Sequence, residues 1–475
     1  MLEIKSLYYT SKTKRTNMEQ NLPQNQPVNI QPPPVSNIPQ KRFSPKKIIV
    51  FSAIAVILAI IVALAIFVIT KISRNDPKDE QITLTYWTAW EDPKVLEPLI
   101  KEYETQNPNV KIKLEVQDIK SLGDYIERLF TRIKNGGENA PDIYRIHTSW
   151  IPQLRSLLLP LPKETVKSLE IEEQYYTGVK KAISYSGAYY GVPLYTDNLA
   201  LFVNRKLLEY VGKPIPTEWI EMLDTGSQLT TIDSNEKITQ AGVAMGTYEN
   251  IQHSSDIVSL LMIQSGVDLG NPVGERAEKV LEVYTAFAKF PKMWDRTLEN
   301  SKLAFAKGNL AMYFGYSWDI LGIRAVNPLL EYDIVPVPHI PKTNQTITSF
   351  WIEGVSSGTK HPDAAFKFLE FLGKKESLAK IFENASKVRG QSGIYPRRDL
   401  GETQKNDTLF GTFVNQAENS EPTIFAADTY DNAMVDKLNN YLKDAVNESL
   451  GNSSYKSATE KLKLGIDQVT SQYVK

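Results

Sequence analysis

The stretch ITLTYWTAWEDPKVLEPLIKEYETQNPNVKIKLE, residues 82–115, decides the fold. Residues 82–87 are rich in β-branched and aromatic side chains, which predicts a strand. Asp92 followed by Pro93 is typical of a helix start, because Asp can accept a hydrogen bond from the first turn and Pro fits that turn. Apolar residues then alternate from 110 to 116, which predicts a second strand. A strand, a helix and a strand in this order indicate an α/β fold.

The next segment continues the same pattern. Ser121 can cap a second helix, Asn135-Gly136-Gly137 ends it, and residues 142–146 predict a third strand. Repeated strand–helix–strand units imply parallel strands joined by right-handed crossovers. Ligands of open α/β sheets bind beyond the carboxyl ends of the strands. The loops at 87–91 and 147–150, both rich in aromatic residues, therefore meet at one edge of the predicted sheet.

Bulk composition narrows the classes of function. A chain of 475 residues is long enough for two lobes, and its formal net charge of −1 gives no general attraction for nucleic acid. Cysteine is absent, which excludes disulfides, thiol catalysis, thiolate metal sites and a lipid anchor on cysteine. The four histidines lack metal-ligand spacing and no phosphate-binding loop occurs, so no metal or cofactor is expected.

An apolar run near the N-terminus predicts a membrane anchor. Residues 48–70 contain 23 residues without a charge, and a helix of that length spans roughly 34 Å. A cleavable signal peptide is the alternative, but its apolar core is shorter, about 7–15 residues. Residues 1–47 carry eight Lys or Arg, which places this Pro-rich, disordered tail in the cytoplasm. After a linker at 71–80, the folded part lies outside the cell or in the periplasm.

Several ordered blocks together resemble one family. Besides the opening stretch they are APDIYRIHTSWIPQLRSLLLPL, YYGVPLYTDNLALFVNRKLLE, PTEWIEML, FAKGNLAMYFGYSW, SGTKHPDAAFKFLEFL and GIYPRRDL. In this order they resemble the extracellular solute-binding proteins of family 1, the maltose-binding-like receptors of ABC importers, over residues 81–470. Each block by itself is a weak signal, and the order and spacing carry the resemblance.

The resemblance implies a two-lobed periplasmic-binding-protein-like fold (type II) with an interlobe hinge. The N-terminal lobe would comprise residues 81–196 and 350–392, and the C-terminal lobe residues 197–349 and 393–475. The chain would cross between the lobes near 197–199, 346–350 and 392–396. Such a monomer closes over its ligand and docks on the permease subunits of an importer.

The resemblance also implies a set of ligand-binding residues by position. They are Trp90, Glu91, Trp150, Asp197, Tyr248, Glu249, Trp318 and Tyr395. Flat aromatic rings suit the apolar faces of a pyranose, and carboxylates suit its hydroxyls, so a carbohydrate is the expected ligand. A Trp at a strand end can instead cover the core, Asp197 can be a hinge residue, and Glu91 can favour a helix N-terminus. Ser149 stands where the family often has a charged residue.

Three alternatives remain beside a receptor for transport. Gly354–Gly358 matches the G-x-S-x-G pattern of esterases, but His361, the only later histidine, lies too close to Ser356 in the chain for triad geometry. The 55 acidic residues leave the paired carboxylates of a glycoside hydrolase open. A ligand sensor without transport is the third. We expect a binding protein that is not an enzyme, has no cofactor and contacts the membrane through residues 48–70.

Overall fold

The computed structural model describes residues 56–67, 81–118, 121–137, 139–451 and 453–473. The chain forms two compact units, Met1–Pro77 and Lys78–Lys475. In the first unit residues 56–67 are helical and their apolar side chains are exposed. Within the described residues, no helix is both long and apolar enough to cross a membrane. The rest of the predicted span at 48–70, the tail at 1–47 and the linker at 71–80 lie outside the described residues.

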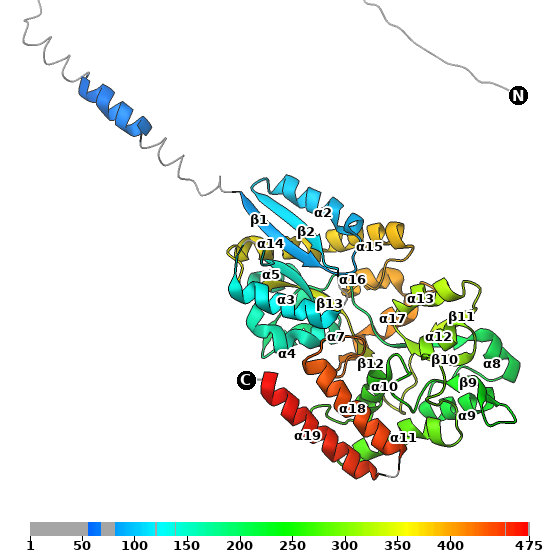
Figure 1. Cartoon of the computed structure of the whole chain (residues 1–475). Helices are drawn as coiled ribbons and strands as arrows, with labels where there is room; N and C mark the ends of the chain where they lie inside the picture. The colour runs from blue at the N-terminus through cyan, green and yellow to red at the C-terminus, as the bar shows by residue number, and fades with distance from the viewer. Residues whose placement is uncertain (1–55, 68–80, 119–120, 138, 452, 474–475) are drawn as a thin grey trace, which may run out of the picture. The chain divides into compact units, whose positions relative to one another are not determined.

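The second unit begins with a five-stranded sheet (Figure 1). In spatial order its strands are β2 (Val110–Val116), β1 (Ile82–Thr88), β3 (Ile143–His147), β13 (Trp351–Ser356) and β4 (Leu158–Leu159). The predicted parallel pairing of the first three strands is confirmed, and β13 joins them antiparallel. The helices α2 (Pro93–Gln106), α3 (Leu122–Asn135) and α14 (Pro362–Gly373) pack on this sheet, and α15 (Lys375–Arg389) packs on α2 and α14. The predicted caps are also confirmed, because Asp92 and Ser121 each accept a backbone N–H of the first turn.

A second five-stranded sheet forms the core of the other lobe. Its order is β11 (Tyr332–Val335), β7 (Ala200–Asn204), β10 (Leu310–Gly315), β9 (Ile238–Val243) and β8 (Thr231–Ile232). Its helices are α8 (Arg205–Val211), α9 (Trp219–Leu229), α10 (Ser254–Gln264), α11 (Glu275–Lys289), α12 (Ser301–Ala306) and α13 (Asp319–Val326). Trp219 and Trp294 are buried in this lobe, as expected for packing residues.

Short elements and a helical pair complete the unit. The short ones are α4 (Ile151–Leu154), α5 (Lys163–Ser168), α6 (Ile171–Gln174), α7 (Thr177–Ile183), β5 (Ser184–Tyr185), β6 (Ala188–Tyr189), α16 (Arg398–Gly401) and α17 (Gly411–Gln416). The C-terminal pair is α18 (Met434–Leu450) and α19 (Tyr455–Tyr473), and both helices pack on α11. Figure 1 shows this pair running past the second lobe toward the first.

The segments that join the two sheets lie side by side. Thr196 bridges to Ile394 and Asn198 bridges to Thr348, while β12 (Thr346–Thr348) pairs with β14 (Ser420–Pro422). The lobe boundaries stay a prediction. The short apolar segment at 191–194, before the first predicted crossing, is expected from the sequence to be a strand. That prediction is wrong: only an isolated bridge forms there, and Pro193 has no N–H to donate to a ladder.

Gly242 in β9 packs against Gly226 of α9 so closely that a Cβ at residue 242 would lie 1.9 Å from the carbonyl oxygen of Gly226. We predict that Gly242→Ala lowers the free energy of unfolding by about 2–3 kcal/mol, because two backbones must separate. The matched control is Gly322→Ala in α13, where a Cβ meets no atom within 4 Å and helix propensity improves. Urea denaturation measures both variants, and equal effects would contradict the prediction.

Candidate functional site

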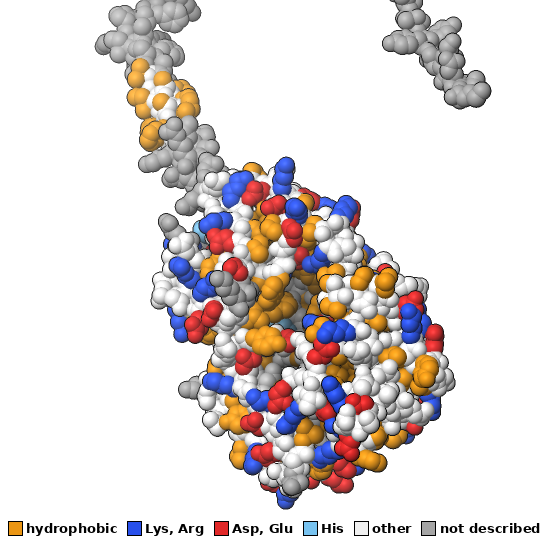
Figure 2. Space-filling model, turned by 45° about the vertical axis from the view of Figure 1, so that its right-hand side comes forward, with side chains coloured by type: hydrophobic (Ala, Val, Ile, Leu, Met, Phe, Trp, Pro, Cys, Tyr) orange, Lys and Arg blue, Asp and Glu red, His pale blue; other side chains and the backbone are white. Residues whose placement is uncertain are grey.

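The lobes face each other across a hollow, and Figure 2 shows hydrophobic side chains gathered in it. Two tryptophans at the ends of strands are exposed. Trp90 follows β1 in the first lobe with 54% of its surface accessible, and Trp318 follows β10 in the second lobe with 41%. An exposed indole beside such a hollow offers a flat apolar face and an N–H donor to a ligand. They are the starting point for the candidate site.

An aromatic cluster, formed by Trp90, His147, Trp150 and Trp351, lies at the edge of the first sheet. Trp351 is its centre, with ring centroids 4.5 Å from Trp90, 5.0 Å from Trp150 and 5.2 Å from His147, all in edge-to-face geometry. The two tryptophan loops predicted to meet are thus joined by a third tryptophan. Trp150 is fully buried beneath Trp351, so Trp90 and the half-buried Trp351 offer the accessible ring surface.

Buried charges hold the Trp90 loop in place. Trp90 has φ 58°, a left-handed conformation that costs a non-glycine residue about 1–2 kcal/mol. On one side of it Arg145 donates to the Ala89 carbonyl at 2.9 Å, and on the other Glu91 accepts from Arg389 at 2.9 Å. Because both neighbours of Trp90 are fixed, the backbone that presents its ring to the hollow between the lobes is held in place. The carboxylate of Glu91 is itself buried and paired.

The same arginine completes a buried ion pair. Arg145 lies 2.7 Å from Glu353 of β13 and 3.9 Å from Glu91. Burial raises the pKa of Glu353, and Arg145 opposes that rise through its charge and hydrogen bonds. Removing one partner would leave a buried charge uncompensated, which typically costs about 3–5 kcal/mol. The pair therefore fixes the β3–β13 edge that carries His147 and Trp351.

The second lobe presents a stacked pair of rings. Trp318 lies parallel on Tyr316, with centroids 4.2 Å apart and an interplanar angle of 14°. Tyr316 is buried and meets His253 edge-to-face at 5.0 Å. The stack supports one face of the Trp318 indole from behind. An aromatic ring backed in this way is a rigid platform for an apolar ligand face.

Asp197 links the first joining segment to this platform. Its Oδ2 accepts from the Ser317 N–H at 3.0 Å and from the Ser317 hydroxyl at 2.5 Å, and its Oδ1 accepts from the Asn198 N–H at 2.8 Å. Burial raises the pKa of Asp197 to about 8, and these hydrogen bonds limit the rise. The side chain is a buried link between the joining segment and the β10–α13 loop.

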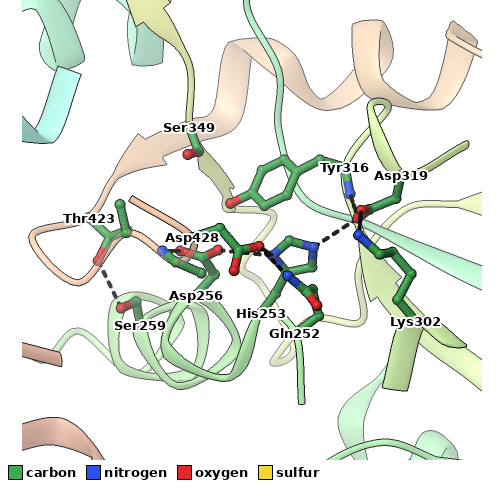
Figure 3. Close-up of polar contacts among 12 residues, drawn as sticks. Gln252, His253, Asp256, Ser259, Lys302, Tyr316, Asp319, Ser349, Thr423 and Asp428 are labelled. Atoms are coloured by element: carbon green, nitrogen blue, oxygen red, sulfur yellow. Dashed lines mark hydrogen bonds and ion pairs between the residues drawn. The ribbon is translucent and has the colours of Figure 1, made fainter. Parts of the chain in front are cut away.

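A buried polar cluster lies beneath the platform, and Figure 3 shows His253 between Asp428 and Asp319. The ring of His253 is 2.8 Å from Asp319, 3.6 Å from Asp428 and 3.7 Å from Asp256. Burial by itself lowers the pKa of His253, but Asp319 and the other two carboxylates raise it to about 9. Burial raises the pKa of Asp256 to about 7. Within the described part of the chain, no group of three such side chains has the arrangement of a metal site.

Hydroxyl groups connect the aromatic cluster to the second joining segment. His147 lies 3.0 Å from the Ser349 hydroxyl through Nε2 and 2.7 Å from the Ser149 hydroxyl through Nδ1. Burial lowers the pKa of His147 to about 3, so the ring is neutral and has one donor and one acceptor nitrogen. Ser349 is also labelled in Figure 3, on the far side of Tyr316 from His253.

The other predicted site residues lie apart from these rings. Tyr248 and Glu249 line a pocket of about 410 Å³ beside α18. Tyr395 stacks on Phe382 of α15 at 3.6 Å, near the third joining segment. Ser356 of the G-x-S-x-G pattern is the fully buried last residue of β13, and its hydroxyl accepts a hydrogen bond from the Gly358 N–H in the turn that follows.

Sequence reasoning did not nominate the centre of the cluster. Trp351 is the first residue of β13, and Tyr316 stands two residues before Trp318, but neither is among the predicted site residues. His147 contacts Trp351 only because β13 pairs with β3 across about 200 residues of chain. The available signal was position: Trp351 directly follows the predicted crossing at 346–350, and His147 directly follows the predicted strand at 142–146.

Comparison with known proteins identifies the family. The sequence profile of bacterial extracellular solute-binding proteins matches residues 98–392. The chain belongs to this family. The multiple sugar-binding protein of Streptococcus mutans is 23% identical over 407 residues, 79% of this chain and 92% of that protein. The maltodextrin-binding protein MdxE of Bacillus subtilis is 22% identical over 350 residues, 70% and 80% of the two chains.

Solved structures show the same two-lobed fold. A cyclo/maltodextrin-binding protein complexed with maltotetraose has a TM-score of 0.65 at 18% identity, covering 83% of this chain and 98% of that one. A solute-binding protein of Thermotoga lettingae bound with α-D-tagatose has a TM-score of 0.60 at 20% identity, covering 82% and 99%. The resemblance stated from the sequence is confirmed. As a member of this family, the chain is a binding protein and not an enzyme.

The raised pKa of Asp197 gives a pH prediction. The pKa of the Asp197 carboxyl is about 8 in the folded protein and about 3.9 in the unfolded chain. The group therefore stabilises the fold at low pH, and this contribution is lost as the pH rises to 8. We predict that the free energy of unfolding falls from pH 4 to 8 less steeply in Asp197→Asn than in the wild type. The two slopes should differ by up to about 1.4 kcal/mol per pH unit, and urea titration at each pH measures them. Exposed Asp444→Asn is the control, and identical slopes for Asp197→Asn and the wild type would refute the assignment.

Proposed function

We propose that this chain is a membrane-anchored receptor that captures a carbohydrate between its lobes and delivers it to an ABC importer. The observation that carries the proposal is the pair of accessible aromatic surfaces, Trp90 with Trp351 on one lobe and Trp318 on the other. His147 contacts Trp351 and is hydrogen-bonded to Ser349, and the Asp197 link is hydrogen-bonded to the loop that carries Trp318. Apolar rings flanked by hydroxyl and imidazole groups match the two kinds of surface on a sugar.

The charges near these rings favour a neutral ligand. Arg145 and Arg389 are both engaged with Glu91, and Arg145 also with Glu353. Arg397 binds Glu170 and Asp399, and Arg398 binds Glu418, so the two arginines after Tyr395 act within the protein. A phosphorylated ligand needs cations that are not already neutralised. An uncharged sugar needs none.

The relatives support the ligand class. The two bacterial relatives are named as binding proteins for maltodextrin and for multiple sugars. Structural neighbours were solved with bound maltotetraose, mannobiose, mannotriose or α-D-tagatose. A protein of Pyrococcus horikoshii that is 21% identical over 397 residues is named as an ABC transporter extracellular-binding protein. Delivery to permease subunits is the corresponding proposal for this chain, with closure of the lobes as the signal.

The anchor belongs to the same proposal. Residues 48–70 are apolar and uncharged, and basic residues are concentrated before them. A helix there would hold the receptor at the outer face of the membrane and keep it near its transporter, which raises the effective concentration. No cysteine is available for a lipid anchor in this chain.

Trp318→Ala tests the ligand site. We expect it to weaken binding of the cognate sugar about tenfold or more, because one stacking face is lost. A thermal-shift panel of maltose, maltotetraose, mannobiose and α-D-tagatose on the full chain, in a detergent without a sugar headgroup, identifies that ligand. Calorimetry then compares Trp318→Ala with Tyr210→Ala, which removes an exposed aromatic ring from α8. No response to any sugar, or equal affinity in both variants, would reject the proposed site.

Deletion tests the anchor. We expect the full chain to sediment with membranes and resist extraction by high salt, and removal of residues 48–70 to release it. Deleting residues 17–39, a segment of equal length in the polar tail, is the matched control and should leave the chain membrane-bound. Intact mass would show an uncleaved N-terminus. A soluble full chain, or a mature form that begins after residue 70, would contradict the anchor.

A further inference from the structure

The carboxylate of Asp319 closes the loop that carries Trp318. Asp319 directly follows Trp318 and is the first residue of α13, and its side chain is buried. Its Oδ2 accepts the Tyr316 N–H at 3.2 Å and the Tyr313 hydroxyl at 2.9 Å. A Cβ at Gly315 would lie 2.9 Å from the same oxygen, so the backbone passes close to it. The position of this carboxylate therefore sets the backbone on both sides of the Trp318 indole.

Two cations from outside the loop hold this carboxylate. The Nε2 of His253, which precedes α10, lies 2.8 Å from Oδ2, and the Nζ of Lys302, on α12, lies 3.3 Å from Oδ1. The His253 side chain is only 1% exposed, whereas that of Lys302 is 35% exposed. Solvent screens an accessible ion pair, and a buried pair keeps more of its attraction. His253 is therefore the partner that fixes the direction of the carboxylate.

The same imidazole supports the ring beneath Trp318. It meets Tyr316 edge-to-face with centroids 5.0 Å apart, and Tyr316 stacks on the Trp318 indole at 4.2 Å. Figure 3 shows the imidazole below the Tyr316 ring and directed at Asp319. His253 thus contacts the loop at two points, the residue after Trp318 and the ring behind it. Because His253 is itself buried, it acts on the indole through these two residues.

The other ring nitrogen of His253 lies among carboxylates. Nδ1 is 3.7 Å from Asp256 and 3.6 Å from Asp428, and it has no hydrogen-bond partner among the described residues. Burial lowers the pKa of His253, but Asp319 and these two carboxylates raise it to about 9, so the ring is charged at neutral pH. Apolar side chains of similar volume commonly stabilise a fold as well as a buried ion pair does. The orientation of Asp319 therefore explains the imidazolium better than stability does.

We infer that His253 is a positioning residue for ligand binding: through the Asp319 carboxylate and the Tyr316 ring it holds the Trp318 indole in the orientation that receives the ligand. This inference rests on the proposed function and specifies it, because it names a buried residue that sets the affinity of the same site without contacting the sugar. Without the imidazole the indole loses its single orientation, and ligand binding then carries the entropic cost of ordering the ring.

Calorimetry on the full chain tests this role, with whichever of maltose, maltotetraose, mannobiose and α-D-tagatose binds. We expect His253→Asn to weaken binding about fivefold or more, because Asn reaches the position of Nδ1 but not that of Nε2. His253→Gln places an amide nitrogen near the position of Nε2 and should bind within about threefold of the wild type. In the Trp318→Ala background, His253→Asn should change affinity by less than about twofold, since the indole that it positions is gone. Comparable losses in both backgrounds would overturn the inference.

His361→Asn is the matched control. His361 precedes α14 as His253 precedes α10, and neither side chain caps its helix, so both substitutions place Asn at a helix N-cap. His361→Asn should leave affinity unchanged. Gly242→Ala, which lowers the stability of the same lobe away from the Trp318 loop, should also bind normally, and melting temperature reports the stability of each variant. A loss of affinity in Gly242→Ala equal to that in His253→Asn would overturn the positioning role.

Fluorine NMR of the full chain labelled with fluorotryptophan provides a measurement without ligand. The signals are assigned with Trp318→Phe, Trp87→Phe and Trp150→Phe. We expect His253→Asn to shift or broaden the Trp318 signal and to leave those of Trp87 and Trp150, which are buried in the first lobe, unchanged. Normal binding and an unmoved Trp318 signal in His253→Asn would overturn the inference and leave the receptor standing. Failure of every sugar to bind the wild type would instead reject the proposed function, and with it the role of His253 in sugar binding.

Discussion

The carboxylate of Asp197 joins a segment between the two sheets to the loop that carries Trp318, and the site depends on this link. The hydroxyl and N–H of Ser317 both point to one of its oxygens, so the loop cannot move without the joining segment. Thr348 donates to the Asp197 carbonyl and Ser349 N–H binds the same residue, which ties in the second joining segment. A change in the angle between the lobes would therefore be transmitted directly to the Trp318 platform.

The opposing surface is held by a different device. Trp90 is kept in a strained backbone conformation because Arg145 and Arg389 secure the residues on either side. Strain of this kind persists only where the surroundings fix it, and it is commonly associated with binding sites. The buried ion pairs thus fix the position of Trp90 without contacting a ligand themselves. Glu91 is part of this support through its ion pair with Arg389.

Local patterns predicted most of the first lobe. The strand at 82–88, the caps Asp92 and Ser121 and the parallel pairing follow from short-range periodicity and capping chemistry. The centre of the site could not be found in this way. The contacts of Trp351 with Trp90 and Trp150, and of Asp197 with Ser317, join segments more than 100 residues apart. Residue type and position bring candidates such as Trp318 forward, but only the fold decides which of them face each other.

A structure of the full chain with its bound sugar tests the central claim most directly. The account predicts sugar rings between the lobes, with one apolar face on Trp318 and another against Trp90 or Trp351, and hydroxyls near His147 and Ser349. The lobes should lie closer together than in the ligand-free protein. A sugar bound outside the space between the two sheets, or lobes unchanged by its binding, would contradict the account.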